Sequence, residues 1–279
     1  MNFVFHKLGM CREVGLPRYG EQSRGVSPSG AQDQFSFRSG NILLSNDEHT
    51  EGLEFIAPPV LEFTKKTYFC LVGAAYGEVH LNDQVIEHGR VYLADKGEVL
   101  SFKKKLYGFR TYLCTKSFEN NNVAELVGRT RGNFKELAHW PEPKGKIRIM
   151  RGPEFHLLEN GDSFLNQALE ISREMSEMGL RLEGNELLLK KQVNMISSPV
   201  ALGTVQLSPS GPIILMRECQ TVGGYPRVFS VISADLDLLA QMNPGQKIDF
   251  QLVDQSEAVE CLKQQEIDLR ELKRKFENN

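Results

Sequence analysis

Residues 220–227, Gln220-Thr221-Val222-Gly223-Gly224-Tyr225-Pro226-Arg227, connect two strongly apolar runs at 212–216 and 228–232. Short apolar runs that are bounded by Gly-Pro and by polar residues are typical of buried strands. The connection carries two glycines, which tolerate positive φ and leave their backbone N–H groups uncovered. Its amide, phenol and guanidinium groups suit a small uncharged or carboxylate-bearing ligand. The same pattern is typical of an ordinary hairpin with a Gly-Gly turn, so both interpretations stay open.

The composition of the chain restricts the classes of protein to which it can belong. Its 279 residues suffice for one large β domain or two modest ones, and the net charge of -3 with no basic stripe argues against nucleic-acid binding. The first residues lack a long apolar segment and no apolar run has membrane-spanning length, so we expect a cytoplasmic protein without a signal peptide or membrane contact. The five cysteines show no CxxC spacing, which predicts reduced thiols and no disulfide framework.

The spacing of apolar runs predicts a mainly β protein. Short runs alternate with turns over residues 53–113, which is typical of a barrel or a sandwich, and the second half is also strand-rich. A turn-rich segment, Trp140-Pro141-Glu142-Pro143-Lys144-Gly145, marks the expected boundary between the two halves. We therefore expect one domain over residues 1–140 and a second over residues 141–279.

Helical periodicity is expected in four places, at 35–44, 154–170, 235–241 and 257–276. Asp33 would cap the first of these helices, and Ser233 or Asp235 would cap the third. The last helix is amphipathic and packs on the core or on a partner.

Two further strands are expected at 187–189 and 193–196. The charge run Lys103-Lys104-Lys105 is interpreted as a solvated strand edge.

Few residues form a recognisable catalytic pattern. The six histidines show no HxH, HxxxH or HExxH spacing, so no metal site is expected, and the absence of GxSxG and P-loop patterns disfavours a self-contained serine hydrolase or P-loop ATPase. Cys219 adjoins Gln220 but has no histidine close in sequence, and it is interpreted as a buried strand residue. Gln206 alternates with Val205 and Leu207 on an expected strand, and it either reaches the ligand near Gln220 or lies exposed on the sheet.

Several ordered segments carry a resemblance to one family. These are Ala201-Leu202-Gly203-Thr204-Val205-Gln206-Leu207-Ser208-Pro209-Ser210-Gly211-Pro212, residues 220–227, residues 232–245, and Gly25-Val26-Ser27-Pro28-Ser29-Gly30-Ala31-Gln32-Asp33 with Arg38, Asn41 and Asn46 after it. Together they resemble the biotin-dependent carboxyltransferase subunit family, which includes the C subunit of 5-oxoprolinase, the antagonist of the Kip sporulation-kinase inhibitor, and part of urea carboxylase. The resemblance implies two cyclophilin-like β-barrel domains with a few short helices.

The resemblance also implies a site shared with a partner, near which Ser29, Gly30 and Asp33 would lie. Gln206, Gln220, Thr221 and Tyr225 would position an amide or lactam. Backbone N–H groups of Gly223 and Gly224 would face developing negative charge. Arg181 and Arg227 would hold a carboxylate, because a guanidinium matches planar oxygens, although each would equally serve as a surface arginine.

Three functions follow from the resemblance. The first is the C-like subunit of a heteromeric, ATP-dependent 5-oxoprolinase that opens 5-oxoproline to glutamate, with a B-like (Kip-inhibitor-like) and an A-like protein as partners. The second is a biotin-dependent carboxyltransferase subunit that acts on urea or a related amide, for which a separate biotin protein is needed because the chain has no Met-Lys-Met segment. The third is a non-enzymatic antagonist that binds a Kip-inhibitor-like kinase regulator.

Two segments depart from the pattern of the family. Met175-Ser176-Glu177 stands where the family has Ser-Asp-Arg, which reverses a charge beside the expected pocket, and Thr115-Lys116-Ser117-Phe118 replaces a Gly-Gly loop.

Overall fold

The protein is described from a computed structural model, which covers residues 2–118, 126–129, 146–184 and 186–277. It divides into two compact units, and neither is a contiguous half of the chain. Unit 1 contains residues 1–16, 33–139 and 266–279, and unit 2 contains residues 17–32 and 140–265. The units thus differ from the two contiguous domains that we expected, because residues 17–32 cluster with the second half and 266–279 with the first. The expected linker at 140–145 lies outside the described residues.

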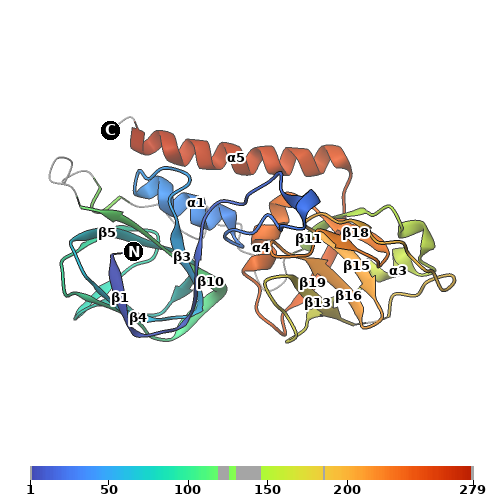
Figure 1. The fold of residues 1–279 in the computed structure, drawn as a ribbon, viewed down its shortest axis with the longest axis horizontal. Helices are drawn as coiled ribbons and strands as arrows, with labels where there is room; N and C mark the ends of the chain where they lie inside the picture. The colour runs from blue at the N-terminus through green and yellow to red at the C-terminus, as the bar shows by residue number, and fades with distance from the viewer. Residues whose placement is uncertain (1, 119–125, 130–145, 185, 278–279) are drawn as a thin grey trace. The chain divides into compact units, whose positions relative to one another are not determined.

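The described part of unit 1 contains two five-stranded antiparallel sheets, a helix near its N-terminal part and the C-terminal part of the last helix of the chain (Figure 1). Its core contains Phe55, Phe63 and Phe69, which are at most 1% exposed. The first sheet has the order β1 (Phe3–Lys7), β4 (Val60–Phe63), β9 (Val99–Phe102), β6 (Val79–Leu81) and β7 (Gln84–Ile86). The second has the order β2 (Met10–Val14), β3 (Gly52–Ala57), β10 (Lys105–Ser117), β5 (Thr67–Tyr76) and β8 (Val91–Ala94).

The first helix of unit 1, α1 (Gln34–Leu43), confirms the expected helix and its cap. The Asp33 carboxylate accepts a hydrogen bond from the Ser36 N–H at 2.8 Å, which satisfies a backbone donor that has no partner within the helix. Phe37 and Leu43 are fully buried, and α1 packs against β5 and β10.

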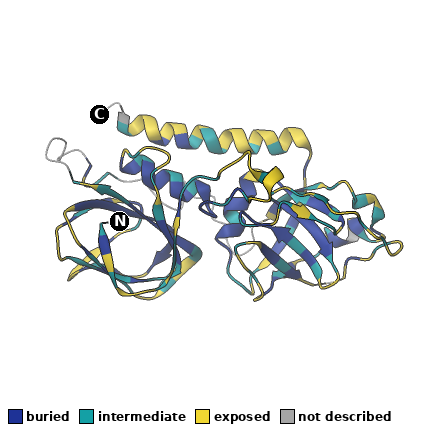
Figure 2. Ribbon diagram, in the orientation of Figure 1, coloured by how far each residue is buried: buried dark blue, intermediate teal, exposed yellow. Residues whose placement is uncertain are grey.

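Unit 2 is a closed seven-stranded barrel (Figure 1). In several of its strands buried residues alternate with less buried ones (Figure 2), whereas residues 204–207 are all buried. Phe164 stacks on both Phe229 and Phe250 inside it. The strand order is β11 (Lys146–Arg151), β18 (Arg227–Val231), β15 (Thr204–Ser208), β16 (Gly211–Leu215), β13 (Gly179–Glu183), β12 (Leu169–Ile171) and β19 (Lys247–Leu252). The mainly β class is confirmed, and the described strands close into a hydrogen-bonded barrel in unit 2.

The prediction of a long helix at 154–170 is wrong. The segment holds the 3-10 turn η2 (Phe155–Leu157), the short helix α3 (Gly161–Phe164) and then strand β12. Gly161 lies so close to the Phe155 ring that a Cβ there would be 2.6 Å from it, so the chain folds back on itself within six residues. The strands expected at 187–189 and 193–196 are also wrong, since only a single bridge joins Leu189 to Leu158.

The short helix α4 (Leu236–Ala240) is confirmed and follows the 3-10 turn η3 (Ser233–Asp235). Neither expected cap acts on it through its side chain. The Asp235 carboxylate instead accepts from the backbone N–H of Arg148 at 2.6 Å and from its guanidinium. The last helix is confirmed as α5 (Gln255–Glu277).

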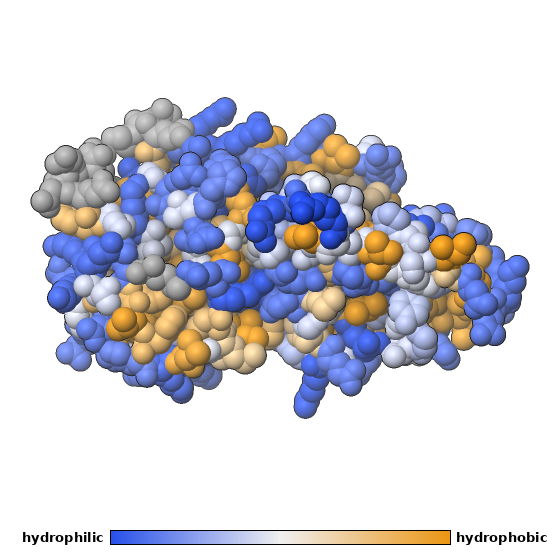
Figure 3. All heavy atoms as spheres, in the orientation of Figure 1, coloured by the Kyte–Doolittle hydropathy of each residue, from blue (hydrophilic) through white to orange (hydrophobic). Residues whose placement is uncertain are grey.

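α5 presents mostly hydrophilic residues to solvent with separate hydrophobic ones between them (Figure 3). Among these hydrophobic residues, Val259, Leu262 and Ile267 are 40–45% exposed. Among the described helices, none combines the length and apolar character needed to cross a bilayer.

Candidate functional site

The segment at 216–226 is a crossover and not a hairpin turn. β16 and β18 do not pair with each other, because β15 lies between them in the barrel. The segment leaves the end of β16 and pairs its own strand β17 (Val222–Gly223) with β14 (Ser198–Pro199) in a two-stranded ribbon separate from the barrel sheet. The ordinary-hairpin interpretation is therefore wrong.

A glycine is required at position 223 by close packing and not by a positive backbone φ. Neither it nor Gly224 has a positive φ. A Cβ at Gly223 would be 2.5 Å from Gln206 Nε2, whereas a Cβ at Gly224 would be 3.2 Å from Ser197 Oγ. Only glycine lets the ribbon approach the Gln206 amide this closely.

Gln206 is the centre of the polar cluster. Its neighbours Val205 and Leu207 belong to the barrel core, so its side chain points out of the barrel, yet it is only 1% exposed. Its Oε1 accepts from Gln220 Nε2 at 3.2 Å, and its Nε2 donates to the Tyr225 carbonyl at 3.4 Å. The alternative of a Gln exposed on the sheet is wrong, and the amide does reach Gln220.

The other residues of the crossover are more accessible. Gln220 is exposed, Tyr225 is 46% exposed, and Thr221 is half-buried with its carbonyl accepting from the Val200 N–H at 3.0 Å. Amides and hydroxyls donate and accept hydrogen bonds without titrating near neutral pH. The cluster is therefore suited to orient a ligand and does not itself supply an acid or a base.

Arg227 is held by a carboxylate of the same unit. Its Nε donates to Glu154 Oε2 at 2.9 Å and its Nη2 to Oε1 at 2.7 Å, while Nη1 reaches the Pro199 carbonyl at 3.1 Å. These hydrogen bonds lower the pKa of Glu154, because Arg227 stabilises its ionised form. The guanidinium that we expected to hold a ligand carboxylate is thus already paired with Glu154, and it has a structural role instead.

Arg181 lies in the same row of the barrel, since it is opposite Ile213, and Ile213 is opposite Gln206. Its guanidinium makes long contacts, at 3.4 Å to Ser208 Oγ and 3.3 Å to the Ser210 carbonyl, and its Nε lies 3.7 Å from the exposed Glu174 carboxylate. Its side chain is 25% exposed. The Arg227 side chain is equally exposed, so Arg181 differs from it in being held less tightly by its neighbours.

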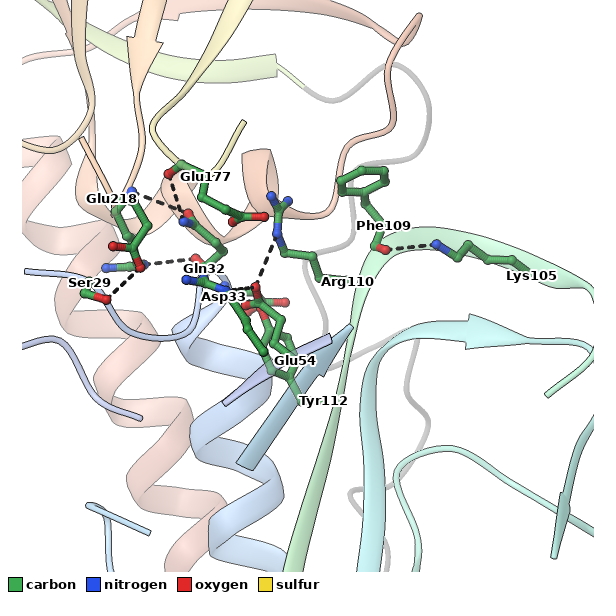
Figure 4. Close-up of polar contacts among 12 residues, drawn as sticks. Ser29, Gln32, Asp33, Glu54, Lys105, Phe109, Arg110, Tyr112, Glu177 and Glu218 are labelled. Atoms are coloured by element: carbon green, nitrogen blue, oxygen red, sulfur yellow. Dashed lines mark hydrogen bonds and ion pairs between the residues drawn. The ribbon is translucent and has the colours of Figure 1, made fainter. Parts of the chain in front are cut away.

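The segment around Ser29 folds against the beginning of the crossover (Figure 4). Ser29 has a φ of 59° and Gly30 a φ of 89°, so the chain turns through left-handed backbone here. Ser29 Oγ donates to Glu218 Oε1 at 2.6 Å, and its N–H donates to the Arg217 carbonyl at 3.1 Å. Ser29 and Gly30 thus lie in the same unit as the Gln206 cluster, beside the turn from which the crossover starts.

Glu177, which reverses a charge relative to the family pattern, lies beside this segment. Its carbonyl accepts from Gln32 Nε2 at 3.0 Å and from the Glu218 N–H at 3.1 Å (Figure 4). The changed residue therefore adjoins the segment that carries Ser29 and Gly30.

Sequence reasoning missed a buried ion pair that anchors residues 17–32. Arg217 is 6% exposed, and its Nε donates to the Gln32 carbonyl and its Nη2 to Asp237 Oδ1, both at 2.9 Å. Gln265 Nε2 donates to the other oxygen of Asp237 at 2.9 Å. No local signal marks this pairing, because Arg217, Asp237 and Gln32 are far apart in sequence.

Asp33 belongs to unit 1, where it caps α1 and its N–H donates to Tyr112 Oη at 2.8 Å. Burial, with the nearby carboxylates of Glu54 and Asp33, raises the pKa of Tyr112 well above its usual value. Glu54 in turn is paired with Arg12 at 2.8 Å and lies 3.7 Å from Arg110 (Figure 4). Asp33 therefore has a structural role as a helix cap.

Cys219 is buried, but in the crossover and not in a strand. Burial raises its pKa to about 11, so its thiol stays protonated and is a poor nucleophile. Within the described ranges no three His, Cys, Asp or Glu side chains gather as ligands of a metal would.

Comparison with known proteins adds relatives to this geometry. The C subunit of a 5-oxoprolinase from Haemophilus influenzae is 30% identical over 289 residues, which cover 93% of this chain and 93% of that protein. The corresponding 5-oxoprolinase C subunit of Escherichia coli is 29% identical, over 89% of this chain and 90% of that protein. The solved structure of the K. lactis urea amidolyase matches 97% of this chain and 20% of that chain with a TM-score of 0.85 and 21% identity. This likeness confirms the cyclophilin-like β fold.

The family model described as carboxyltransferase domain, subdomain A and B, matches residues 24–125 and 120–252. These ranges contain every site residue that we expected from the sequence. The chain belongs to this carboxyltransferase domain family.

Proposed function

We propose that this chain is the C-like subunit of a heteromeric, ATP-dependent 5-oxoprolinase, which opens the lactam of 5-oxoproline to give glutamate. The observation that carries the proposal is the 30% identity to the C subunit of a 5-oxoprolinase across 93% of both chains. A match over nearly the full length of both proteins favours a shared role over a shared domain alone.

The polar cluster supports a role in positioning the lactam. The crossover presents three accessible residues, Gln220, Thr221 and Tyr225. The buried Gln206 holds the crossover in place through its hydrogen bonds to Gln220 and to the Tyr225 carbonyl. Backbone N–H groups of Gly223 and Gly224 serve the developing negative charge on the lactam oxygen. Arg181, whose contacts to Ser208, Ser210 and the exposed Glu174 are all long, takes the substrate carboxylate, while Arg227 holds Glu154 and the Pro199 carbonyl in place.

The chain acts with B-like and A-like partner proteins in the cytoplasm, and the site is completed by the B-like protein. The names of the relatives, which are subunits themselves, support a multi-subunit assembly. We assign ATP to the complex as a whole, because the chain has no P-loop pattern and the Arg227 fork at the cluster is already paired with Glu154.

The test is reconstitution. The chain is purified with the B-like and A-like proteins of the same genome, and glutamate formation from 5-oxoproline is measured with and without ATP. We expect ATP-dependent turnover by the trio and none by the chain alone. Gln220→Ala is expected to lower kcat/KM about tenfold or more, as removal of one positioned hydrogen bond does. A folded, assembled trio without ATP-dependent turnover sinks the proposal.

A biotin-dependent carboxyltransferase acting on urea or a related amide is the second candidate. It is favoured by the family description and by the 25% identity to a putative urea carboxylase of Emericella nidulans. The chain would then accept a carboxyl group from a separate biotin protein. Recovery of a biotinylated protein with the tagged chain, together with transfer of labelled carboxylate to an amide, supports this candidate over the first. Binding of the B-like protein with neither activity supports the antagonist role instead.

A further inference from the structure

Two cysteines of unit 1 are direct neighbours across a pair of strands. In the antiparallel pairing of β5 with β10, Cys70 lies opposite Cys114. Directly opposite residues share one face of the sheet, with Cα atoms about 4.5–5.5 Å apart. This separation falls inside the range of about 4.4–6.8 Å that a disulfide spans. Both residues are completely buried, and both sulfurs are thiols in the structure.

The two sulfurs meet beneath the same helix. The Cys70 thiol donates to the Gly40 carbonyl of α1 with 3.4 Å between sulfur and oxygen, and the Cys114 thiol donates to the Phe37 carbonyl at 3.8 Å. A Cβ at Gly40 would be 2.7 Å from Cys114 Sγ, so α1 approaches the pair as closely as glycine allows. Register and helix packing thus independently place both sulfurs on one side of the sheet and close together.

We propose that Cys70 and Cys114 form a reversible intrachain disulfide and are an oxidation site for a peroxide-class oxidant. One thiolate attacks a peroxide oxygen, which gives a sulfenic acid and releases the other oxygen as water after protonation. The second thiol then attacks the sulfenic sulfur, the S–S bond forms, and the hydroxyl leaves as water. Two thiols and one hydrogen peroxide thereby give one disulfide and two waters, and sulfur is oxidised as the peroxide is reduced.

Burial under α1 determines when this reaction takes place. Because neither sulfur is accessible in the folded unit, the oxidant reaches the pair only when α1 lifts from β5 and β10. Disulfide formation then removes both thiol donors that face the Phe37 and Gly40 carbonyls. The oxidised protein therefore holds α1 less firmly, and reduction restores the docked helix.

The remaining cysteines provide internal controls. Cys11 lies opposite Phe55, Cys219 is buried in the crossover of unit 2, and Cys261 accepts a hydrogen bond from Arg148 Nη1 at 2.7 Å. None of these three faces a second cysteine across a strand pair, so none is expected in the disulfide.

The test is oxidation of the full chain by hydrogen peroxide in urea below the unfolding transition, followed by complete unfolding, alkylation and peptide mapping. We expect a single disulfide between the peptides that contain Cys70 and Cys114, reversed by dithiothreitol, and faster hydrogen exchange of the α1 amides in the oxidised form. Cys219→Ala leaves this result unchanged, and Cys70→Ala leaves Cys114 open to alkylation. The proposal is overturned if both cysteines of the wild-type protein are recovered as thiols or sulfonic acids, or if either is joined to another cysteine. Because the wild-type map decides the outcome, failure of a variant to fold does not affect it.

Discussion

The guanidinium of Arg227 forms a bidentate ion pair with the Glu154 carboxylate, which accepts from Nη2 at 2.7 Å and from Nε at 2.9 Å. The same carboxylate also accepts from the Arg227 backbone N–H at 2.9 Å. The pair joins the start of β18 to the segment after β11 in unit 2. Arg227 therefore holds the end of the crossover in place.

Glu154→Gln tests this structural role. The amide keeps the shape but loses the charge, so we expect a loss of about 1–2 kcal/mol in the free energy of unfolding, at the low end because the pair is partly exposed. Since Arg227 lowers the pKa of Glu154, the contribution of the pair is present at neutral pH and disappears as acid protonates the carboxylate. Urea denaturation measures both effects. Asp162→Asn, at an exposed pair with Arg151, is the control and is expected to cost less than about 0.5 kcal/mol. Equal effects in the two variants contradict the interpretation.

The two adjacent glycines of the crossover are predicted to tolerate alanine unequally. Gly223→Ala puts a methyl group 2.5 Å from Gln206 Nε2, which must move, and overpacking of this kind costs about 1–3 kcal/mol. Gly224→Ala meets only the Ser197 hydroxyl at 3.2 Å and is expected to cost about 0.5 kcal/mol. Thermal denaturation compares the two, and turnover of the reconstituted complex should fall more in the first variant. A larger effect of Gly224→Ala would show that the packing argument is wrong.

The Arg217–Asp237 pair is predicted to hold residues 17–32 on unit 2. Asp237→Ala leaves a buried arginine without its charge partner, which costs about 3–5 kcal/mol. It also weakens the contact of Arg217 with Gln32, so trypsin should cut faster at the exposed Arg18 and Arg24 under native conditions. Asp235→Ala is the matched control, because it removes another buried carboxylate, bound to Arg148, that does not touch the segment. Equal acceleration of cleavage in both variants would attribute the effect to general instability.

His88 is predicted to make unit 1 sensitive to acid. Burial lowers its pKa to about 4, and its Nε2 accepts from the Tyr76 N–H at 3.2 Å, which requires the neutral ring. Between pH 6.5 and 4 the unfolded chain binds a proton that the folded chain does not. The free energy of unfolding therefore decreases as the pH is lowered through this range, by up to about 3 kcal/mol. His88→Gln should lack this part of the pH dependence, and His49→Gln, at an exposed position, should keep it. Urea denaturation from pH 4 to pH 7 gives the comparison, and parallel profiles for His88→Gln and wild type would contradict the assignment.

Lys105 is predicted to be an unusually reactive amine. Its Nζ donates to the carbonyls of Ile56 and Phe109 at 2.8 and 2.9 Å, and burial, with the nearby Arg110 charge, lowers its pKa to about 8. About half of it is neutral at pH 8, compared with well under 1% of an ordinary lysine. Trace labelling with acetic anhydride across pH 6–11 should give a midpoint near pH 8 for Lys105. The exposed Lys104 is labelled in the same experiment for comparison, and a midpoint above pH 10 for Lys105 contradicts the prediction.

Local chemistry was sufficient to predict several elements. The Asp33 cap of α1 acts over three residues, and the amphipathic pattern of α5 is continuous, so both could be located from sequence alone. The interpretation of residues 103–105 as a solvated strand edge is partly wrong. Lys103 and Lys104 are exposed, whereas Lys105 begins β10 and is half-buried. The two backbone carbonyls that hold Lys105 are set by tertiary structure and leave no mark in its immediate sequence.

The geometry of the candidate site depended on contacts between distant residues. The amide of Gln206 could be expected near Gln220, but the placement of β15 between β16 and β18, which changes a turn into a crossover, arises only from strand order. Glu154, the partner of Arg227, is 73 residues away in the sequence, so the local pattern around Arg227 could not predict the pair.

The interleaved division of the chain limits how the protein can be taken apart. The polypeptide passes from one unit to the other at residues 17, 33, 140 and 266. A gene cut at the midpoint would yield a first fragment that carries a piece of unit 2 and lacks the end of α5, and a second fragment with the opposite defects. Neither half then contains every residue of one unit, and only expression of both together, as complementing fragments, would restore two complete units.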